Sequence, residues 1–301
     1  MSSYHVPVLL KESVDGLAIR PDGVYVDVTF GGGGHSLEIL KRLGDRGRLY
    51  AFDQDEASKA NAIVDERFTL IVANFRYLKR FLRLQGVREV DGILADLGVS
   101  SHQFDQAERG FSTRFDARLD MRMDRQADLD AYQVVNTYDE QALRQLFYKY
   151  GELKNAPTLA KKIVEGRQEK PLETSGELNE LLRPVLFRHK QNKILAQVYQ
   201  AIRIEVNHEI AVLKEFLKQT QELIKPGGRL SVISYHSLED RLVKRYIRSG
   251  LFEGEPEKDF YGQVRVPFKK VGKMRVAGPE EIEHNNRARS GKLRIGERIE
   301  N

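Results

Sequence analysis

Short apolar runs alternate with amphipathic segments over the first third of the chain. The runs are rich in β-branched, aromatic and aliphatic side chains, as buried strands are, and they occupy residues 24–30, 47–52, 68–72 and 90–96. The segments between them repeat apolar positions at helical spacing, and they occupy residues 35–43, 57–64 and 77–84. Strands separated by helices predict βαβ units and a parallel, doubly wound sheet.

The alternation stops in the middle of the chain. From about residue 105 to 192 no convincing buried strand occurs, and helical spacing predominates instead. Helices are predicted over residues 131–150, 155–169 and 175–187, with Pro157 and Thr174 suited to helix starts. Helices are again predicted over 200–223, followed by a strand at 229–234 and a helix at 240–248.

This pattern predicts two domains. We expect a Rossmann-like, doubly wound α/β domain, formed by residues 1–104 and 200–301 together. An inserted, mostly helical domain is expected over residues 105–199. At 301 residues and 41% hydrophobic composition, the chain is long and apolar enough for both.

Composition narrows the functional classes. The chain has no cysteine, which excludes disulfides, thiolate metal sites and a cysteine nucleophile. Its histidines show no metal-ligand spacing, so no metal is expected. No apolar stretch approaches the length of a membrane helix, and the N-terminus does not resemble a secretory signal. We therefore expect a soluble, cytoplasmic protein without a membrane partner.

Positive charge is concentrated near the C-terminus. Residues 265–301 contain ten Lys or Arg and five Glu, which accounts for the whole formal net charge of +5. A basic tail of this kind either binds RNA or keeps the protein soluble. The pair of arginines in Asn285–Ser290 suits phosphate binding, with a solvated loop as the alternative.

A glycine-rich turn joins the first predicted strand to the following helix. Four glycines, Gly31–Gly34, bring backbone N–H groups close to a ligand, and Asp53 ends the next strand, where a carboxylate accepts hydrogen bonds from ribose. Asp27 in the first strand and the turn Lys225–Gly228 favour S-adenosylmethionine over NAD. A tight turn without a ligand is the structural alternative.

Two later strand ends carry polar residues. Asp96 ends the fourth strand, where it is expected to face the reaction centre of an amino-methyltransferase or, alternatively, to cap a turn. In Ser234–Asp240, His236 suits donation to a base and Tyr235 suits stacking on one. The alternative is that Tyr235 packs at the core edge and Ser237 caps the next helix. The alternation in Leu119–Asp124 is typical of a half-buried edge strand.

Together these segments resemble the RsmH (MraW) family of bacterial 16S rRNA cytosine-N4 methyltransferases. The matching motifs follow in family order along nearly the whole chain: His5–Leu10, Thr29–Ser36, Asp91–Ser101, Ala107–Ser112, Leu119–Asp124, Gln200–Asn207, Pro226–Ser231, Ser234–Arg241 and Arg287–Ser290. Departures from the family pattern occur at Gly32, where arginine is common, at Asn286, where proline is usual, and over 189–197.

The resemblance implies that the α/β domain is a class I S-adenosylmethionine methyltransferase domain and that the inserted helical domain, residues 105–199, recognises the substrate. It also implies a reaction and a set of site residues. The expected reaction transfers a methyl group from S-adenosylmethionine to the N4 amine of a cytidine in 16S rRNA of the small ribosomal subunit, in its decoding region. The cofactor site carried over from the family comprises Gly33, Gly34, His35, Asp53, Phe75, Asp96 and Gln103.

The catalytic residues expected from this combination are Asp96, Ser100 and His236. Asp96 would accept a hydrogen bond from the amine and help to remove its proton, with the flipped base over the loop that contains Ser100. Two alternatives remain at this point: a methyltransferase for another RNA, DNA or protein amine, and a non-catalytic nucleotide sensor that binds RNA. The sequence leaves a homodimer open.

Overall fold

The computed structural model describes residues 7–256 and 264–300. His5 and Val6 of the N-terminal motif and Asn301 of the basic segment lie outside the described residues. The chain divides into two compact units: a first unit, Met1–Gly98 with Ile210–Asn301, and a second unit, Val99–Glu209. The inserted domain predicted over 105–199 lies within the second unit, and its role in substrate recognition stays a prediction.

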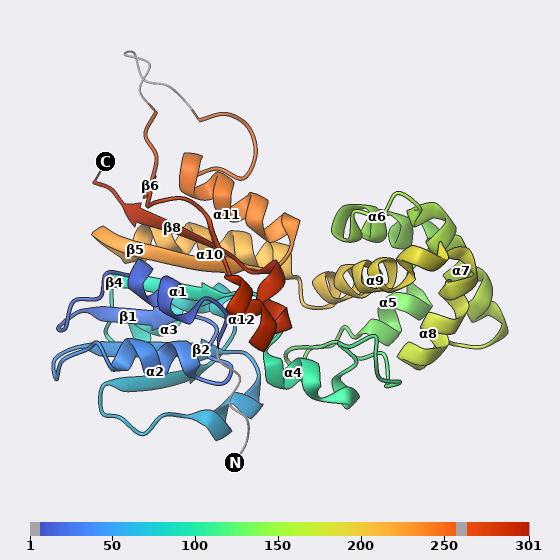
Figure 1. Ribbon diagram of the computed structural model, residues 1–301, viewed down its shortest axis with the longest axis horizontal. Helices are drawn as coiled ribbons and strands as arrows, with labels where there is room; N and C mark the ends of the chain where they lie inside the picture. The colour runs from blue at the N-terminus through green and yellow to red at the C-terminus, as the bar shows by residue number, and fades with distance from the viewer. Residues whose placement is uncertain (1–6, 257–263, 301) are drawn as a thin grey trace. The chain divides into compact units, whose positions relative to one another are not determined.

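The first unit is built on one sheet, whose described strands follow the order β3-β2-β1-β4-β5-β8-β6, with β7 also paired to β8 (Figure 1). Strands β1 to β5 pair with one another in parallel, and β8 runs antiparallel to β5, β6 and β7. The expected Rossmann-like α/β fold is confirmed. The strands are β1 (Val24–Asp27), β2 (Arg48–Asp53), β3 (Phe68–Val72), β4 (Val90–Asp96), β5 (Ile224–Ser234), β6 (Phe268–Lys270), β7 (Arg275–Val276) and β8 (Lys292–Arg298).

Helices cover both faces of this sheet. Apolar residues of α1 (Leu10–Gly16) and α2 (Gly34–Leu40) pack with Tyr25, Leu49 and Leu94 on one face. On the other face the helices α3 (Leu78–Leu84), α10 (Glu209–Leu223) and α11 (Ser237–Ser249) bury a larger cluster that includes Phe52 and Phe216. Burial on both faces explains why the central strands are continuously apolar rather than alternating.

The basic C-terminal segment is part of the sheet. The alternative of a solvated tail is wrong for β8, which lies between β5 and β6 and is preceded by the short helix α12 (Pro279–His284). RNA binding by the basic segment stays a prediction. Leu293 and Ile295 on one side of the strand are buried. On the other side Arg294 binds Asp240 of α11, at 2.6 Å between Nε and Oδ1. Arg294 and Lys292, whose Nζ lies 3.6 Å from Asp240 Oδ2, are therefore used within the fold.

The second unit is helical, as its periodicity predicts. Pro157 lies in the first turn of α7, and Thr174 caps α8 in a reciprocal arrangement with Glu177. The segment predicted as one helix over 131–150 is two, because Asp139 begins a new helix by accepting a hydrogen bond from the Ala142 amide. The helices are α4 (Ser101–Asp105), α5 (Ala131–Thr137), α6 (Glu140–Gly151), α7 (Ala156–Glu169), α8 (Ser175–Leu182) and α9 (Gln191–Val206).

Two local predictions are wrong. Residues 57–64, expected to be α-helical, form a short 3-10 helix over Glu56–Asn61, followed by irregular chain. Leu119–Asp124 is a loop instead of an edge strand, although its alternating apolar side chains are buried. Met121 has φ +58°, which no strand tolerates, and the Asp120 carboxylate binds both the backbone amide and the guanidinium of Arg122. No helix in the described part of the chain is long and apolar enough to cross a membrane.

The ion pair between Asp240 and Arg294 should contribute measurably to stability, because both side chains are mostly buried. Burial alone would raise the pKa of Asp240, but the hydrogen bond and charge of Arg294 bring it below its usual value. We expect Asp240→Ala to lower the free energy of unfolding by about 2 kcal/mol, measured by urea denaturation.

Glu56→Gln is the matched control, because the Lys59–Glu56 pair is exposed on both sides. This substitution should change stability by less than about 0.5 kcal/mol. Equal losses in the two variants would show that Arg294 does not fasten β8 to α11.

Candidate active site

Three carboxylates lie at one edge of the sheet in the first unit. Asp27, Asp53 and Asp96 are the last residues of β1, β2 and β4, which are adjacent parallel strands. Parallel strands end on the same side, and ligands of open α/β sheets bind beyond those carboxyl ends. The topology therefore gathers acidic groups that are far apart in the sequence.

Asp96 forms hydrogen bonds with residues that follow the two neighbouring strands. The Tyr235 hydroxyl, just past β5, donates to Asp96 Oδ1 at 2.6 Å. The Asp96 backbone amide donates to Thr29 Oγ1 at 2.6 Å. Burial raises the pKa of Asp96 to about 7, the Tyr235 bond opposes the rise, and the charges of Asp27 and Glu239 add to it. With 22% of its side chain exposed, the carboxylate stays accessible to a ligand.

Asp27, at the end of the neighbouring strand β1, is fully buried. It accepts hydrogen bonds from the Ser36 hydroxyl at 2.8 Å and from the Thr29 amide at 3.1 Å. Burial raises its pKa to about 6, although both hydrogen bonds oppose the rise, and the charge of Asp53 adds to it. These bonds join α2 and the chain just after β1 to the end of that strand, and the charge of Asp27 adds negative potential at Asp96.

The glycine turn is closed by Asp53. Gly31 donates its amide to Asp53 Oδ2 at 2.8 Å, and the Asp55 amide donates to Oδ1 at 2.9 Å. Gly33 has φ +78°, a conformation that favours glycine. A Cβ on Gly34 would lie 2.2 Å from the Pro7 ring, so this position also requires glycine. A carboxylate accepts several hydrogen bonds, which allows Asp53 to bind ribose hydroxyls in addition.

His35 supplies a buried polar atom that points to a ligand. Only 4% of the residue is exposed, and its Nε2 has no hydrogen-bond partner among the described residues. Burial lowers its pKa to about 4, although a hydrogen bond with the Val8 backbone opposes the fall. The ring is therefore neutral at physiological pH, with Nδ1 at 3.8 Å from Asp96 Oδ2. A buried polar atom without a partner is uncommon and suggests a ligand group.

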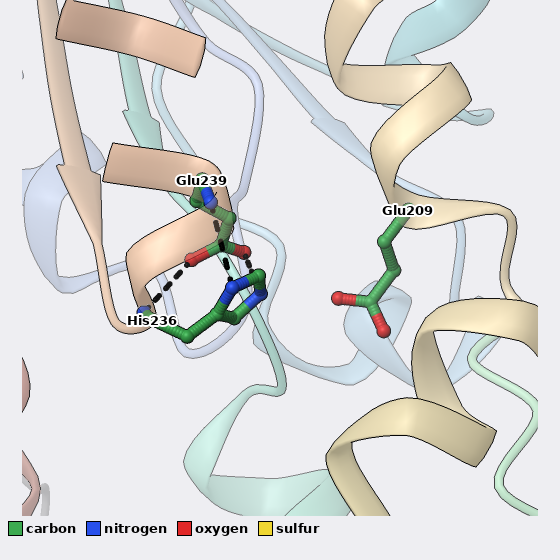
Figure 2. Close-up of side chains that lie close together, drawn as sticks. All are labelled: Glu209, His236 and Glu239. Atoms are coloured by element: carbon green, nitrogen blue, oxygen red, sulfur yellow. Dashed lines mark hydrogen bonds and ion pairs between the residues drawn. The ribbon is translucent and has the colours of Figure 1, made fainter. Parts of the chain in front are cut away.

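His236 begins α11, as Figure 2 shows. Its Nδ1 accepts a hydrogen bond from the Glu239 amide at 3.4 Å, and Glu239 Oε2 accepts from the His236 and Tyr235 amides. The expectation that Ser237 caps this helix is wrong, because the cap lies one residue earlier. Tyr235 packs at the edge of the core, against the cluster that includes Ile233 and Leu293, and its hydroxyl also binds Asp96. Stacking of its ring on a base stays a prediction.

The remaining predicted residues divide between the two units. Phe75 lies in the first unit, in a 3-10 helix just after β3, and packs edge to face against Phe216 at 5.2 Å between ring centroids. Ser100 and Gln103 belong to the second unit. There the Ser100 hydroxyl accepts from the Gln103 amide, and Gln103 Oε1 accepts from the Ser100 amide.

The first unit therefore brings together most of the predicted site, and its chemistry fits S-adenosylmethionine. Carboxylates with raised pKa values gain from a nearby cation, and the sulfonium and amino group of this cofactor are cationic. Two contacts of Asp96 were missing from the sequence-based prediction, those of Thr29 and Tyr235. The sequence does place both residues just after predicted strands, which is the feature that could have indicated these contacts.

The raised pKa of Asp96 predicts the sign of a stability change. Because the fold disfavours the ionised carboxylate, Asp96 lowers the free energy of unfolding progressively as the pH rises from the ordinary pKa of 3.8 to the folded pKa of about 7. The loss is complete above the folded pKa and absent below the ordinary one. Without cofactor, Asp96→Asn should therefore be more stable than the parent protein at pH 8, by about 2–4 kcal/mol, and equal to it near pH 4. Thermal unfolding across this pH range measures the difference.

Asp65→Asn is the control with the opposite sign. Arg67 holds the pKa of Asp65 down, to about 2, chiefly through a side-chain hydrogen bond. This variant should be less stable than the parent at pH 8. A loss of stability at pH 8 in both variants would contradict the electrostatic account of Asp96.

Comparison with known proteins identifies the family. The profile of the MraW methylase family matches residues 2–299. Proteins named Ribosomal RNA small subunit methyltransferase H are 68% identical in Christiangramia forsetii, over 99% of each chain, and 56% identical in Bacteroides fragilis, over 99% of this chain and 98% of that one. A putative rRNA methylase structure from Clostridium thermocellum has 13% identity and a TM-score of 0.45, covering 98% of this chain and 99% of that one, too weak a similarity to bear on function. The chain belongs to the MraW methylase family.

Proposed function

We propose that the protein transfers a methyl group from S-adenosylmethionine to the N4 amine of a cytidine in 16S rRNA of the small ribosomal subunit. Membership of a methylase family and the names of its close relatives support the substrate class. The observation that carries the choice of an amine is Asp96, an accessible carboxylate at the end of β4 that is oriented by Tyr235.

The chemistry of an exocyclic amine explains why a carboxylate is needed. The N4 lone pair of cytosine is delocalised into the ring, so the amine is a weak nucleophile and acquires positive charge as it is methylated. A hydrogen bond to a carboxylate favours the pyramidal nitrogen and stabilises that charge. S-adenosylmethionine supplies an electrophilic methyl group on its sulfonium. The protein's main contribution is to hold the amine in line with it.

Tyr235 makes Asp96 a directional acceptor. By donating to Oδ1, Tyr235 orients the carboxylate and leaves Oδ2 to accept an amine hydrogen. A pKa of about 7 lets Asp96 be ionised at neutral pH and still take up the proton that methylation makes acidic. Tyr235 itself stays protonated, because burial and then the charge of Asp96 raise its pKa. We assign Tyr235 as a positioning residue.

The other assignments follow the site geometry in the first unit and the family pattern in the second. Asp53 would bind ribose, Phe75 would pack on adenine, and His35 Nε2 would accept a hydrogen from the cofactor. His236 is proposed to donate to the base or its ribose, from the start of α11. The full proposed set is Gly33, Gly34, His35, Asp53, Phe75, Asp96 and Gln103 for the cofactor, with Asp96, Ser100 and His236 for catalysis.

Tyr235→Phe should shift the pH dependence of methylation. The Tyr235 hydrogen bond lowers the pKa of Asp96, so its loss raises that pKa. Because the ionised form is active, the acidic limb of kcat/KM should move to higher pH, with a severalfold loss at pH 6 and a smaller one at pH 8.5. Radiolabel incorporation across this range is the measurement. An equal loss at every pH would mean that Tyr235 affects packing alone.

The proposed reaction is tested on small ribosomal subunits from cells that lack the protein. Labelled S-adenosylmethionine should give N4-methylcytidine, identified by nucleoside mass spectrometry after digestion. Asp96→Asn is the matched control, because Asn keeps an oxygen for Tyr235; it should bind cofactor and lose at least about 100-fold in turnover. Label on another base or on protein would contradict the proposed substrate, and full turnover by Asp96→Asn would contradict the mechanism.

A further inference from the structure

A strongly basic corner lies at the start of α9 in the second unit. It comprises two short 3-10 turns, Arg183–Val185 and Arg188–Lys190, and the first turn of α9. Its exposed cations are Arg183, Arg188, Lys190 and Lys193. No Asp or Glu occurs from residue 181 to 204, so the corner has a positive charge that its own segment does not balance.

These cations differ from others in the same unit. None of the four forms an ion pair within the part of the chain that the structure describes. By contrast, Asp120 pairs with Arg122 and Glu177 pairs with Lys170. Unpaired cations that are close in sequence repel one another, and an anionic ligand relieves that repulsion.

Phe187 is an exposed aromatic residue in the same segment as these cations. It is 68% exposed, and its ring has the His189 ring beside it, at 6.2 Å between centroids and tilted by 41°. The backbone beneath is firm: the Lys190 amide donates to the Phe187 carbonyl at 2.8 Å, and Leu186 and Ile194 are buried in the core of the unit. The exposed Phe187 ring is therefore attached to a backbone segment that neighbouring buried residues anchor to the core of the unit.

We propose that this basic corner binds unpaired nucleotides of the rRNA substrate, with a base stacked on Phe187 and phosphates on the surrounding cations. Aromatic rings that stack bases, set within a basic groove or patch, are how proteins bind single-stranded nucleic acid. A single ring offers little area for insertion into a membrane. This inference rests on the proposed function for its RNA, and it deepens that proposal by assigning a contact surface remote in sequence from Asp96.

Binding is measured without turnover, so the test is separate from catalysis. Full-length protein with S-adenosylhomocysteine is titrated with protein-free 16S rRNA and with small subunits over a range of salt concentrations. Phe187→Ala should weaken binding to both by about tenfold with an unchanged salt slope, and Phe187→Tyr should restore it. Lys190→Gln should instead reduce the slope of log Kd against log salt by about 0.7–0.9.

Two substitutions in the same unit are the matched controls. Phe115→Ala removes an exposed aromatic side chain that lies next to the acidic Asp116 in sequence. Lys161→Gln removes a cation that already pairs with Glu165. Both should bind as the parent protein does.

Unchanged binding of Phe187→Ala at all salt concentrations would overturn the proposal. Weakened binding to subunits but not to free rRNA would also overturn it, by showing a ribosomal protein as the partner. If N4-methylcytidine failed to form while the Phe187 and Lys190 effects appeared, the proposed reaction would fail and the RNA surface would stand.

Discussion

The structure of the site depends on one constraint: three carboxylates end adjacent parallel strands and therefore meet at one edge of the sheet. Grouping Asp27, Asp53 and Asp96 in this way is electrostatically unfavourable: beyond the larger effect of burial, the charge of Asp53 raises the pKa of Asp27, and the charge of Asp27 raises the pKa of Asp96. The fold offsets the penalty with local donors. Ser36 and Thr29 bind Asp27, and Tyr235 binds Asp96.

Shifted pKa values follow from this arrangement and give it a function. Burial moves Asp27 and Asp96 toward their neutral forms and keeps His35 neutral as well. Such a site favours a cationic ligand and an amine that becomes positive during reaction, because both stabilise the ionised carboxylates. The electrostatic stabilisation is prepared by the fold before substrate binds, which is the usual source of large catalytic effects. Keeping a buried carboxylate at position 96 lowers the stability of the folded protein, and the predicted gain in stability of Asp96→Asn measures that loss.

Much of this architecture is predictable from sequence because burial on both faces leaves uninterrupted apolar runs. Those runs place Asp53 and Asp96 at strand ends, and parallel topology then brings them together. The antiparallel strand β8 is harder to predict, because Leu293 and Ile295 are separated by the charged Arg294, which binds Asp240 of α11. The prediction for Leu119–Asp124 is wrong for a different reason. Its alternating apolar side chains are buried, but the positive φ of Met121 makes the segment a loop and not a strand.

The hydrogen bond from Tyr235 to Asp96 joins segments 139 residues apart, and no local pattern encodes that distance. The same holds for the cap at His236, since residue preferences favour Ser237 and only the backbone geometry places the cap one residue earlier. The sequence thus predicts that functional residues lie at the strand ends. The residues that bind Asp96 and shift its pKa can be identified only from the folded structure.

Proton release on cofactor binding tests the central claim, that Asp96 lies beside the reacting sulfonium. Calorimetric titrations near pH 7, in buffers of different ionisation enthalpy, count the protons released. S-adenosylmethionine should release more protons than S-adenosylhomocysteine, whose sulfur is neutral, because the added positive charge lowers the pKa of Asp96 from about 7. The difference should vanish in Asp96→Asn. Equal release for the two ligands in the parent protein would contradict the account.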